Sequence, residues 1–360
     1  MTVATAEDRG HAARLGRSSD LVMALRQNSP LFAAIALFLV LWVFYNAFHP
    51  RGFSPQVMVQ NANEAFSLAL VAMAQTVPVL AGGLDLSVGA VMTLVGCVAS
   101  HLLSGSPAEI AFGILVCLLS GALAGLVNGL VVVYGRIQPI IATLATGAVY
   151  IGLALMLRPE PGGEVDEDLN WAMTNALPDL AETFGWGEGG LWSYFDWLPV
   201  PIILLVLVVV LVWVPFRRSV TGRAVYAIGS AEGAAYMSGL NLDRAKIAAF
   251  TLAGFLAGVA GTFLAIQTAS GNADIPQAGA YTLNSIAAVV IGGTSLLGGA
   301  GSAIGSIFGA FVLRTIEDLL FVFDLPPLWQ PLFLGVVLLV SVGLGSLRLV
   351  RVRNRLELYR

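Results

Sequence analysis

Long apolar stretches alternate with short polar, glycine-containing or proline-containing segments along most of this chain. A helix needs about 20 apolar residues to cross a bilayer, and ten stretches approach that length. The expected spans are 31–48, 64–81, 87–104, 109–134, 139–157, 198–214, 247–268, 279–297, 302–323 and 329–347. The pattern therefore predicts an all-α polytopic membrane protein with about ten transmembrane helices.

One of the apolar regions is interrupted by a short segment that contains an acid and several glycines. It reads GGLDLSVG over residues 82–89 and separates the second expected span from the third. Non-helical backbone at membrane depth is tolerated only where protein or a water-filled path satisfies its amide groups. We therefore expect Gly82, Gly83 and Gly89 to form a helix break, with one kinked helix as the alternative. Breaks of this kind commonly mark the substrate path of a transporter.

Basic and acidic residues are unevenly distributed among the polar segments. Arginines precede the first span and follow the last, and a basic cluster lies within 215–246, whereas 158–197 holds nine acidic residues and one arginine. Polar segments rich in Lys and Arg near span ends stay in the cytoplasm. We therefore predict a protein of the inner (plasma) membrane with both termini in the cytoplasm. The predicted parts are a cytoplasmic tail (1–30), a transmembrane domain (31–347) with an external loop (158–197) and a cytoplasmic coupling loop (215–246), and a second cytoplasmic tail (348–360).

The composition supports a membrane protein and excludes several other classes. Of the 360 residues, 57% are hydrophobic and 11% are charged, whereas a soluble domain carries about 25% charged residues. The single lysine, Lys246, follows no glycine-rich phosphate-binding loop. Cys97 and Cys117 lie in apolar stretches and are interpreted as packing residues. We expect no metal, no cofactor, no nucleic-acid partner and no enzymatic activity of the chain's own.

Asp85 is the costliest residue of the predicted membrane zone. A carboxylate at the centre of a bilayer costs at least about 2.5 kcal/mol, so an acid at this depth suggests a function. Asp85 and Ser87 also suit a helix N-cap, in which a side-chain oxygen accepts a free amide of the following helix. We favour the cap over direct substrate contact, although a capped helix end can still line the path.

Uncharged polar residues recur within the other apolar stretches. Apart from Asp85 and Ser87, the candidates for the substrate path are Gln75, Asn128, Gln138, Thr143, Asn284 and Ser285. Their amides and hydroxyls suit an uncharged, polyhydroxylated solute, although single polar side chains often bond neighbouring helices instead, at about 0.6 kcal/mol each. Beyond Asp85 we identify no strong candidate for a buried carboxylate or histidine relay, which disfavours proton or sodium coupling.

A second glycine-rich segment is similar to the first. Residues 292–300 read GGTSLLGGA and residues 82–90 read GGLDLSVGA, at a spacing of 210 residues. Internal repeats with interrupted spans are typical of transporters, so we predict a second helix break at Gly292 and Gly293. Chance similarity between two glycine-rich turns is the alternative.

Glycines also recur at helix-contact spacing elsewhere, at Gly121, Gly125 and Gly129 and at Gly254 and Gly258. Small residues at this spacing let helices approach closely in lipid. We interpret these positions as structural.

The predicted cytoplasmic loop 215–246 contains the signals of a short helix. Ser230 is placed to cap a helix that starts at Ala231, and Gly239 is placed to end it. A short helix of small residues on this face suits docking to another protein, with a merely solvated loop as the alternative. The candidate docking residues are Glu232, Ala235, Ser238 and Gly239.

Several motifs together resemble the ribose-type monosaccharide permeases of ABC importers. Residues 82–89 are similar to the family motif GGIDLSVG, residues 138–144 read QPIIATL, and residues 291–305 read IGGTSLLGGAGSAIG. The resemblance spans about residues 55–347. It implies an all-helical bundle that pairs with a second permease copy, a separate cytoplasmic ATPase subunit and an extracytoplasmic sugar-binding protein. The chain departs from the family at Gln75, where Met is common, which leaves the identity of the sugar open.

The sequence therefore predicts the membrane subunit of an ABC importer for a monosaccharide or related polyol. The same machinery moving a branched-chain amino acid, a nucleoside or a sugar-derived signal is one alternative. An ion-coupled secondary carrier, which needs no ATPase, is another.

Overall fold

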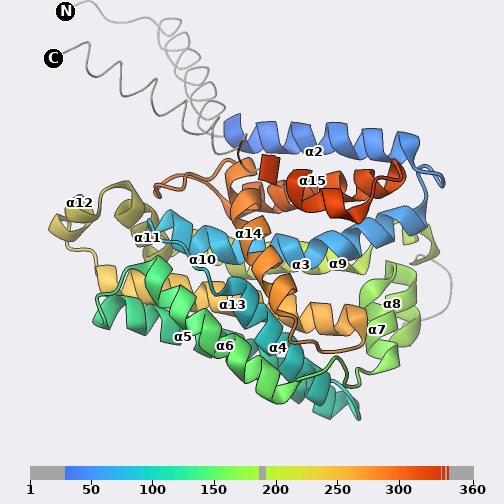
Figure 1. Cartoon of the computed structure of the whole chain (residues 1–360), viewed down its shortest axis with the longest axis horizontal. Coiled ribbons are helices and arrows are strands. Elements are labelled where there is room, and N and C mark those ends of the chain that lie inside the picture. Colours follow the sequence, from blue (N-terminus) through green and yellow to red (C-terminus); the bar gives the residue numbers. More distant parts are fainter. Residues whose placement is uncertain (1–28, 186–191, 334, 337–338, 340–360) are drawn as a thin grey trace, which may run out of the picture.

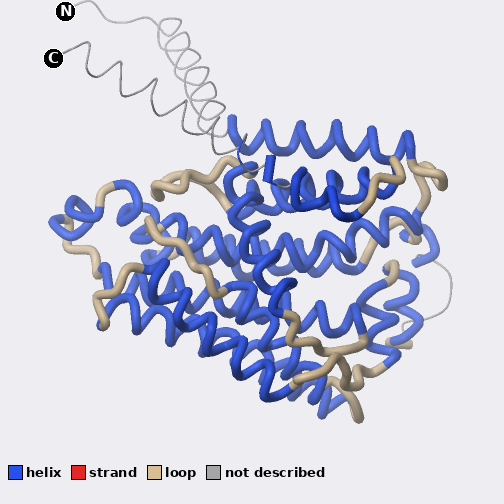
Figure 2. Tube along the Cα trace, in the orientation of Figure 1, coloured by secondary structure: helices blue, strands red, loops and turns tan. Residues whose placement is uncertain are grey.

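A computed structural model describes residues 29–185, 192–333, 335–336 and 339 of the chain. Apart from two isolated β-bridges, every regular element in these ranges is a helix, and Figure 2 shows short loops joining them. The predicted all-α class is confirmed for this part of the chain. The predicted tails, 1–30 and 348–360, lie almost wholly outside the described residues.

The long helices follow the apolar stretches. They are α2 (Ser29–Phe48), α3 (Pro55–Leu80), α4 (Val88–Leu102), α5 (Pro107–Tyr134), α6 (Pro139–Leu157), α13 (Leu242–Thr268), α14 (Ile275–Ile291) and α15 (Ala303–Val322). Three consecutive helical segments form one further long helix, which we call the α9–α10 rod: α9 (Val200–Val208), the π-helical turn η2 (Val209–Trp213) and α10 (Val214–Arg218). A short 3-10 turn, η3 (Pro327–Trp329), follows α15.

Six of these elements are long and apolar enough to cross a membrane: α2, α3, α5, α6, α13 and the α9–α10 rod. The chain is therefore a multi-pass membrane protein. α4 and α14 are apolar but shorter, and the last expected span, 329–347, lies largely outside the described residues. The count of about ten spans consequently stays a prediction.

Several helices start earlier than hydropathy predicts because their first turns are polar and capped. Ser54 and Ser106 each accept the backbone amide three residues on, and a proline follows each at the first helical position. Glu109 accepts the amide of Ser106 at 2.7 Å and completes a capping box. α3 therefore begins at Pro55 and not near residue 64.

α3 lies at the centre of the bundle. It packs against α13, α15, α14 and α9, and 89% of its most apolar window is buried, compared with 17% for α2. A helix in such a position is expected to be apolar nearly all round, yet α3 is the least apolar of the six. The polar residues that α3 does bury, Asn63, Ser67, Gln75 and Thr76, therefore need partners inside the protein.

α5 and α13 touch through glycines, as their spacing predicted. A Cβ added at Gly125 would lie 2.2 Å from the carbonyl oxygen of Phe250, and one added at Gly254 would lie 2.3 Å from that of Gly121. Backbones this close leave no room for a side chain. The small-residue interpretation of these positions is confirmed.

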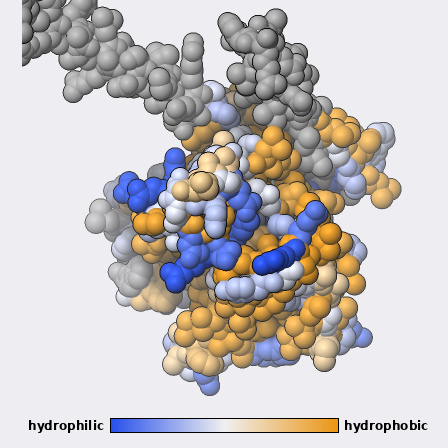
Figure 3. Space-filling model, turned by 90° about the vertical axis from the view of Figure 1, so that its left-hand side faces the viewer, coloured by the Kyte–Doolittle hydropathy of each residue, from blue (hydrophilic) through white to orange (hydrophobic). Residues whose placement is uncertain are grey.

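The two long polar loops lie at opposite ends of the bundle (Figure 1). Segment 158–197 forms α7 (Glu167–Thr174), α8 (Leu177–Thr183) and the 3-10 turn η1 (Trp192–Phe195). At the other end are α11 (Val220–Ser230) and α12 (Glu232–Met237). Figure 3 looks onto this second end, where hydrophilic side chains gather beside an apolar surface.

Candidate functional site

The first helix break is set by glycines that follow α3. Gly82 has a φ of +81°, the left-handed region that glycine adopts at little cost. The amide of Gly83 donates to the carbonyl of Pro78 and that of Gly82 to the carbonyl of Val79, both at 2.9 Å. This Schellman motif ends α3 and separates it from α4, so the chain has two helices here and not one kinked helix.

The second break repeats this geometry after α14. Gly293 also has a φ of +81°, the amide of Thr294 donates to the carbonyl of Val289 at 3.0 Å, and that of Gly293 donates to the carbonyl of Val290 at 2.9 Å. The structural match therefore pairs Gly82 with Gly293, 211 residues apart, and corrects the sequence alignment by one residue. Residue identities align Gly82 with Gly292. The backbone of Gly292, however, is still in the α region, and Gly293 is the residue in the left-handed region.

The carboxylate of Asp85 is buried and bound to Ser87. Its Oδ1 accepts the Ser87 backbone amide at 2.8 Å and the Ser87 hydroxyl at 2.6 Å. The Ser87 hydroxyl oxygen in turn accepts Nδ2 of Asn128 at 2.7 Å, and Oδ1 of Asn128 accepts the phenol of Tyr150 at 3.0 Å. Three predicted path residues, with Tyr150 in addition, thus form one buried chain of hydrogen bonds. Such chains strengthen each member and fix one geometry.

The turn that precedes α4 is also held from outside its own chain segment. The helix starts at Val88, and Ser87 at its N-cap makes no side-chain capping bond within the described chain. Ser87 thus occupies the predicted N-cap position without the predicted side-chain bond, while Asp85 caps the turn that precedes the helix. The hydroxyl of Thr143 on α6 accepts the amide of Leu86 at 2.9 Å, so Asp85, Ser87, Asn128 and Thr143 all meet at this break.

Close approach of α14 explains the glycine at position 89. A Cβ at Gly89 would lie 2.0 Å from the carbonyl oxygen of Ala278. The hydroxyl of Thr282, one turn further along α14, accepts the Gly89 amide at 3.1 Å. The start of α4 is therefore held by α5, α6 and α14 together, which sequence alone does not reveal.

The remaining predicted path residues lie apart from this cluster. Gln75 is fully buried in α3, and neither side-chain atom finds a hydrogen-bond partner among the residues that the structure describes. Gln138 is exposed at the start of α6. Ser285 donates to a carbonyl of its own helix at 2.7 Å, while Nδ2 of Asn284 lies 3.5 Å from a carboxylate oxygen of Glu317.

A cavity of about 380 Å³ connects the first break with the loop 215–246. Gly82, Gly83 and Gln138 line one side of it, and Glu232 and Lys246 line the other. The glycines of the first break, Gln138 and the predicted coupling loop therefore share one cavity at the end of the bundle that carries α12.

A charged cluster that the sequence did not predict lies between α3 and α15. Arg314 donates from Nη2 to Glu64 at 2.5 Å and from Nη1 to Glu317 at 3.0 Å, and its Nη2 lies 3.0 Å from Asp318. Glu317 and Asp318 are buried, so the expectation that Asp85 is the sole strong buried acid is wrong. Their spacing was a usable signal, because residues i, i+3 and i+4 share one helix face.

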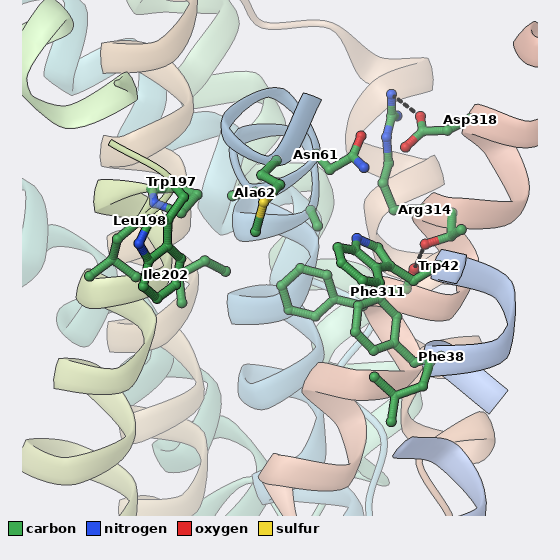
Figure 4. A pocket seen from close by; sticks show the side chains of 15 residues that line it. Phe38, Trp42, Asn61, Ala62, Trp197, Leu198, Ile202, Phe311, Arg314 and Asp318 are labelled. Carbon is green, nitrogen blue, oxygen red and sulfur yellow. Dashed lines mark hydrogen bonds and ion pairs between the residues drawn. The ribbon is translucent and has the colours of Figure 1, made fainter. Parts of the chain in front are cut away.

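A cavity of about 280 Å³ adjoins this cluster, between α2, α3, α9 and α15 (Figure 4). Trp42 and Trp197 lie on its walls, and Asn61, Arg314 and Asp318 supply its polar groups. Among the described residues, no group of three or more His, Cys, Asp or Glu side chains is arranged to hold a metal ion.

The predicted docking helix exists as α12, with changes in detail. Gly239 has a φ of +76°, in the left-handed region, and its amide donates to the Tyr236 carbonyl at 2.9 Å, which confirms that Gly239 ends the helix. The Ser230 hydroxyl donates to a carbonyl of α11 at 2.9 Å, so its predicted capping role is wrong. Ala235 is buried, whereas Met237 is 85% exposed.

The other predicted docking residues are engaged within the loop. Glu232 forms an ion pair with Lys246 of α13 at 2.5 Å, and the Ser238 hydroxyl donates to the Ala234 carbonyl at 2.8 Å. The large apolar side chains that α12 exposes are Tyr236, which is 69% exposed, and Met237, and neither was in the predicted set.

Comparison with known proteins supplies the family. Residues 57–342 match the family model described as branched-chain amino acid transport system / permease component. The ribose import permease protein of Bacillus subtilis (strain 168) is 34% identical over 305 residues, which cover 84% of this chain and 88% of that protein. No solved structure matches the chain.

Two further relatives are named for the import of other compounds. The autoinducer 2 import system permease protein of Enterobacter sp. (strain 638) is 34% identical over 331 residues, 92% of this chain and 90% of that protein. The fructose import permease protein of Bifidobacterium longum (strain NCC 2705) is 30% identical over 330 residues, which cover 89% of this chain and 91% of that protein. The chain therefore belongs to this family of transport-system permease components and is a membrane-spanning permease subunit of an ABC importer.

Proposed function

We propose that this permease forms the translocation path for a monosaccharide or a related polyol. The observation that carries the proposal is the contact between two glycine-terminated helix breaks, in which the amide of Gly299 donates to the carbonyl of Leu80 at 3.0 Å. The relatives of this chain are named for ribose, fructose and autoinducer 2 import. Discontinuous helices commonly mark the substrate site of transporters. Another small solute on the same machinery is the alternative, since the family description names branched-chain amino acids.

Gln75 is the residue that we propose to touch the substrate. The side chains of Asp85, Ser87, Asn128 and Thr143 are committed to hydrogen bonds at the break, and in this state they hold the break in shape. The buried amide of Gln75 has no such bond within the described chain. An unpaired buried amide costs about 1–3 kcal/mol of free energy. A hydroxylated ligand that forms hydrogen bonds with it would gain that amount of binding free energy.

The orientation follows from charge and from the two loop-bearing ends. The basic loop 215–246 and both tails are proposed to be cytoplasmic, and the acidic segment 158–197 external. The positions of α7–α8 and α11–α12 at opposite ends of the bundle support this. Ten spans result if α4, α14, α15 and 329–347 are added to the six that meet length and composition.

The proposed partners follow from the same orientation. The ATPase subunit would dock on α12, where Tyr236 and Met237 are exposed, and the sugar-binding protein would dock on 158–197. A second permease copy would complete the assembly. Closure of the ATPases would move α12 and open the path toward the cytoplasm.

A stimulated ATPase assay tests the substrate class. The complex in nanodiscs, with its binding protein, is expected to hydrolyse ATP faster with ribose or fructose than with leucine. Stimulation by leucine and not by any sugar or polyol would place this chain with the amino-acid transporters.

An ion-coupled carrier is the second candidate, and the cluster of Glu64, Arg314, Glu317 and Asp318 is the observation that favours it. Buried carboxylates are typical of proton and sodium sites. In this chain, however, all three acids contact the same guanidinium. That arrangement suits a structural ion-pair network better than an exchangeable ion site.

A further inference from the structure

The last turn of α11 is wedged between the two helix breaks. A Cβ added at Gly229 would lie 2.0 Å from the carbonyl oxygen of Leu80, at the end of α3, and 2.4 Å from the amide nitrogen of Gly299, in the second break. The backbone of α11 therefore approaches the backbones of both breaks so closely that only glycine fits at position 229. A side chain here would push α11 away from both breaks.

The two breaks also touch each other at the same place. The amide of Gly299 donates to the carbonyl of Leu80 at 3.0 Å. A Cβ added at Gly298 would lie 2.9 Å from both the Cα of Gly229 and the backbone nitrogen of Gly82. Three segments that are distant in sequence therefore meet at Gly82, Gly229 and Gly298, which we call the glycine junction.

One side chain fastens α11 to the second break. The phenol of Tyr226, three residues before Gly229, donates to the carbonyl of Gly301 at 2.9 Å. Burial raises the pKa of Tyr226, with Arg217 acting in the opposite direction. The phenol is therefore protonated and able to donate at neutral pH.

We infer that the glycine junction is the mechanical link through which α11 and α12 move both helix breaks together. Gly229, Gly298 and Tyr226 are thereby positioning residues for transport. The inference rests on the proposed function, in which an ATPase moves α12. Close-packed contacts transmit displacement instead of absorbing it, and a contact between backbones has no rotamers to adjust.

α11 and α12 are joined closely enough to move as one body. α12 begins two residues after α11 ends, and the ion pair between Glu232 and Lys246 ties α12 to the start of α13. A push on α12 therefore reaches Gly229 directly, and from there both Leu80 and Gly299.

Cysteine accessibility in the assembled complex tests this link. Single cysteines replace Leu84 in the first break or Leu297, 68% exposed, in the second, and labelling is compared with and without ATP and vanadate. Both positions are expected to change labelling rate severalfold with nucleotide. In Gly229→Ala both changes are expected to disappear together, although basal ATP hydrolysis continues.

The matched control is Gly233→Ala in α12, where an added Cβ meets nothing within 4 Å in the described structure. It is expected to keep both nucleotide responses. Tyr226→Phe removes one hydrogen bond without crowding the junction. It is expected to reduce the response at Leu297 more than that at Leu84, with the Michaelis constant for substrate unchanged and the maximal rate of uptake lowered.

Three results would overturn the inference. They are full nucleotide responses in Gly229→Ala, a response in Gly229→Ala that is lost at one break and persists at the other, and no response at either break in the unmutated complex. If Gly229→Ala does not assemble, Tyr226→Phe decides, and an unchanged response at Leu297 overturns the link. Nucleotide responses without any sugar uptake would instead count against the proposed function and leave the junction standing.

Discussion

Substitution of Asp85 separates a capping role of its side chain from a need for its charge. Oδ1 of Asp85 accepts both the amide and the hydroxyl of Ser87. Asp85→Asn keeps an oxygen acceptor at the same place, so both bonds can form again. Asp85→Ala removes the acceptor and leaves two donors of Ser87 in a site where Asp85 and Ser87 are 1% and 0% exposed.

The expected magnitudes differ clearly. A buried donor without a partner costs about 1–3 kcal/mol, so alanine is expected to destabilise the break by about 2–6 kcal/mol. A bond to a charged acceptor is stronger than a neutral one by about 1 kcal/mol, so asparagine loses about 2 kcal/mol over two bonds. Removing a buried charge offsets part of that loss. Transport activity is therefore expected to fall in the order Asp, Asn, Ala.

Uptake by proteoliposomes and the unfolding temperature of the purified complex measure the two effects. Ser87→Ala, alone and combined with Asp85→Ala, provides the control, because the double variant should cost less than the sum of the singles. The capping account fails if Asp85→Asn abolishes uptake while the complex assembles and unfolds at the temperature of the unmutated one. That result would require the negative charge itself.

Three further predictions concern topology, packing and the charged cluster. Cysteines that replace Glu182 and Glu232 should label from opposite sides of intact cells, and labelling from one side would reverse the proposed orientation. Gly254→Val should destabilise the bundle by at least about 1–3 kcal/mol, since its Cβ would lie 2.3 Å from a carbonyl oxygen of α5. The control is Gly152→Val, which has open space around it in the described structure and should leave the unfolding temperature unchanged. Arg314→Gln should cost about 3–5 kcal/mol by leaving buried acids unpaired, with Arg314→Lys intermediate, and an unaltered unfolding temperature would contradict the ion-pair network.

Features that depend on local sequence were predictable. Apolar stretches locate the long helices, since burial in lipid or protein favours continuous apolar runs. The glycine at 82 and the glycine at 239 each end a helix in the left-handed region, as their sequence context indicated. Asp85 and Ser87 are two residues apart, so their mutual hydrogen bond is a local property of the break.

Features that depend on tertiary contacts were not predictable from one sequence. The roles of Thr143 and Tyr150 require the placement of α6 against α4 and α5. The cluster around Arg314 requires Glu64, 250 residues away, to face α15. The structural alignment of the two breaks differs by one residue from the sequence alignment. It pairs residues of equal backbone conformation, Gly82 and Gly293, and not residues of equal identity.

The energy source of uptake tests the central claim most directly. Proteoliposomes would contain this permease with its ATPase, and labelled sugar and binding protein would be supplied outside. We predict accumulation that requires both ATP in the lumen and the binding protein, and that persists when ionophores dissipate the ion gradients. Uptake that continues without the ATPase and collapses with the ionophores would contradict the account.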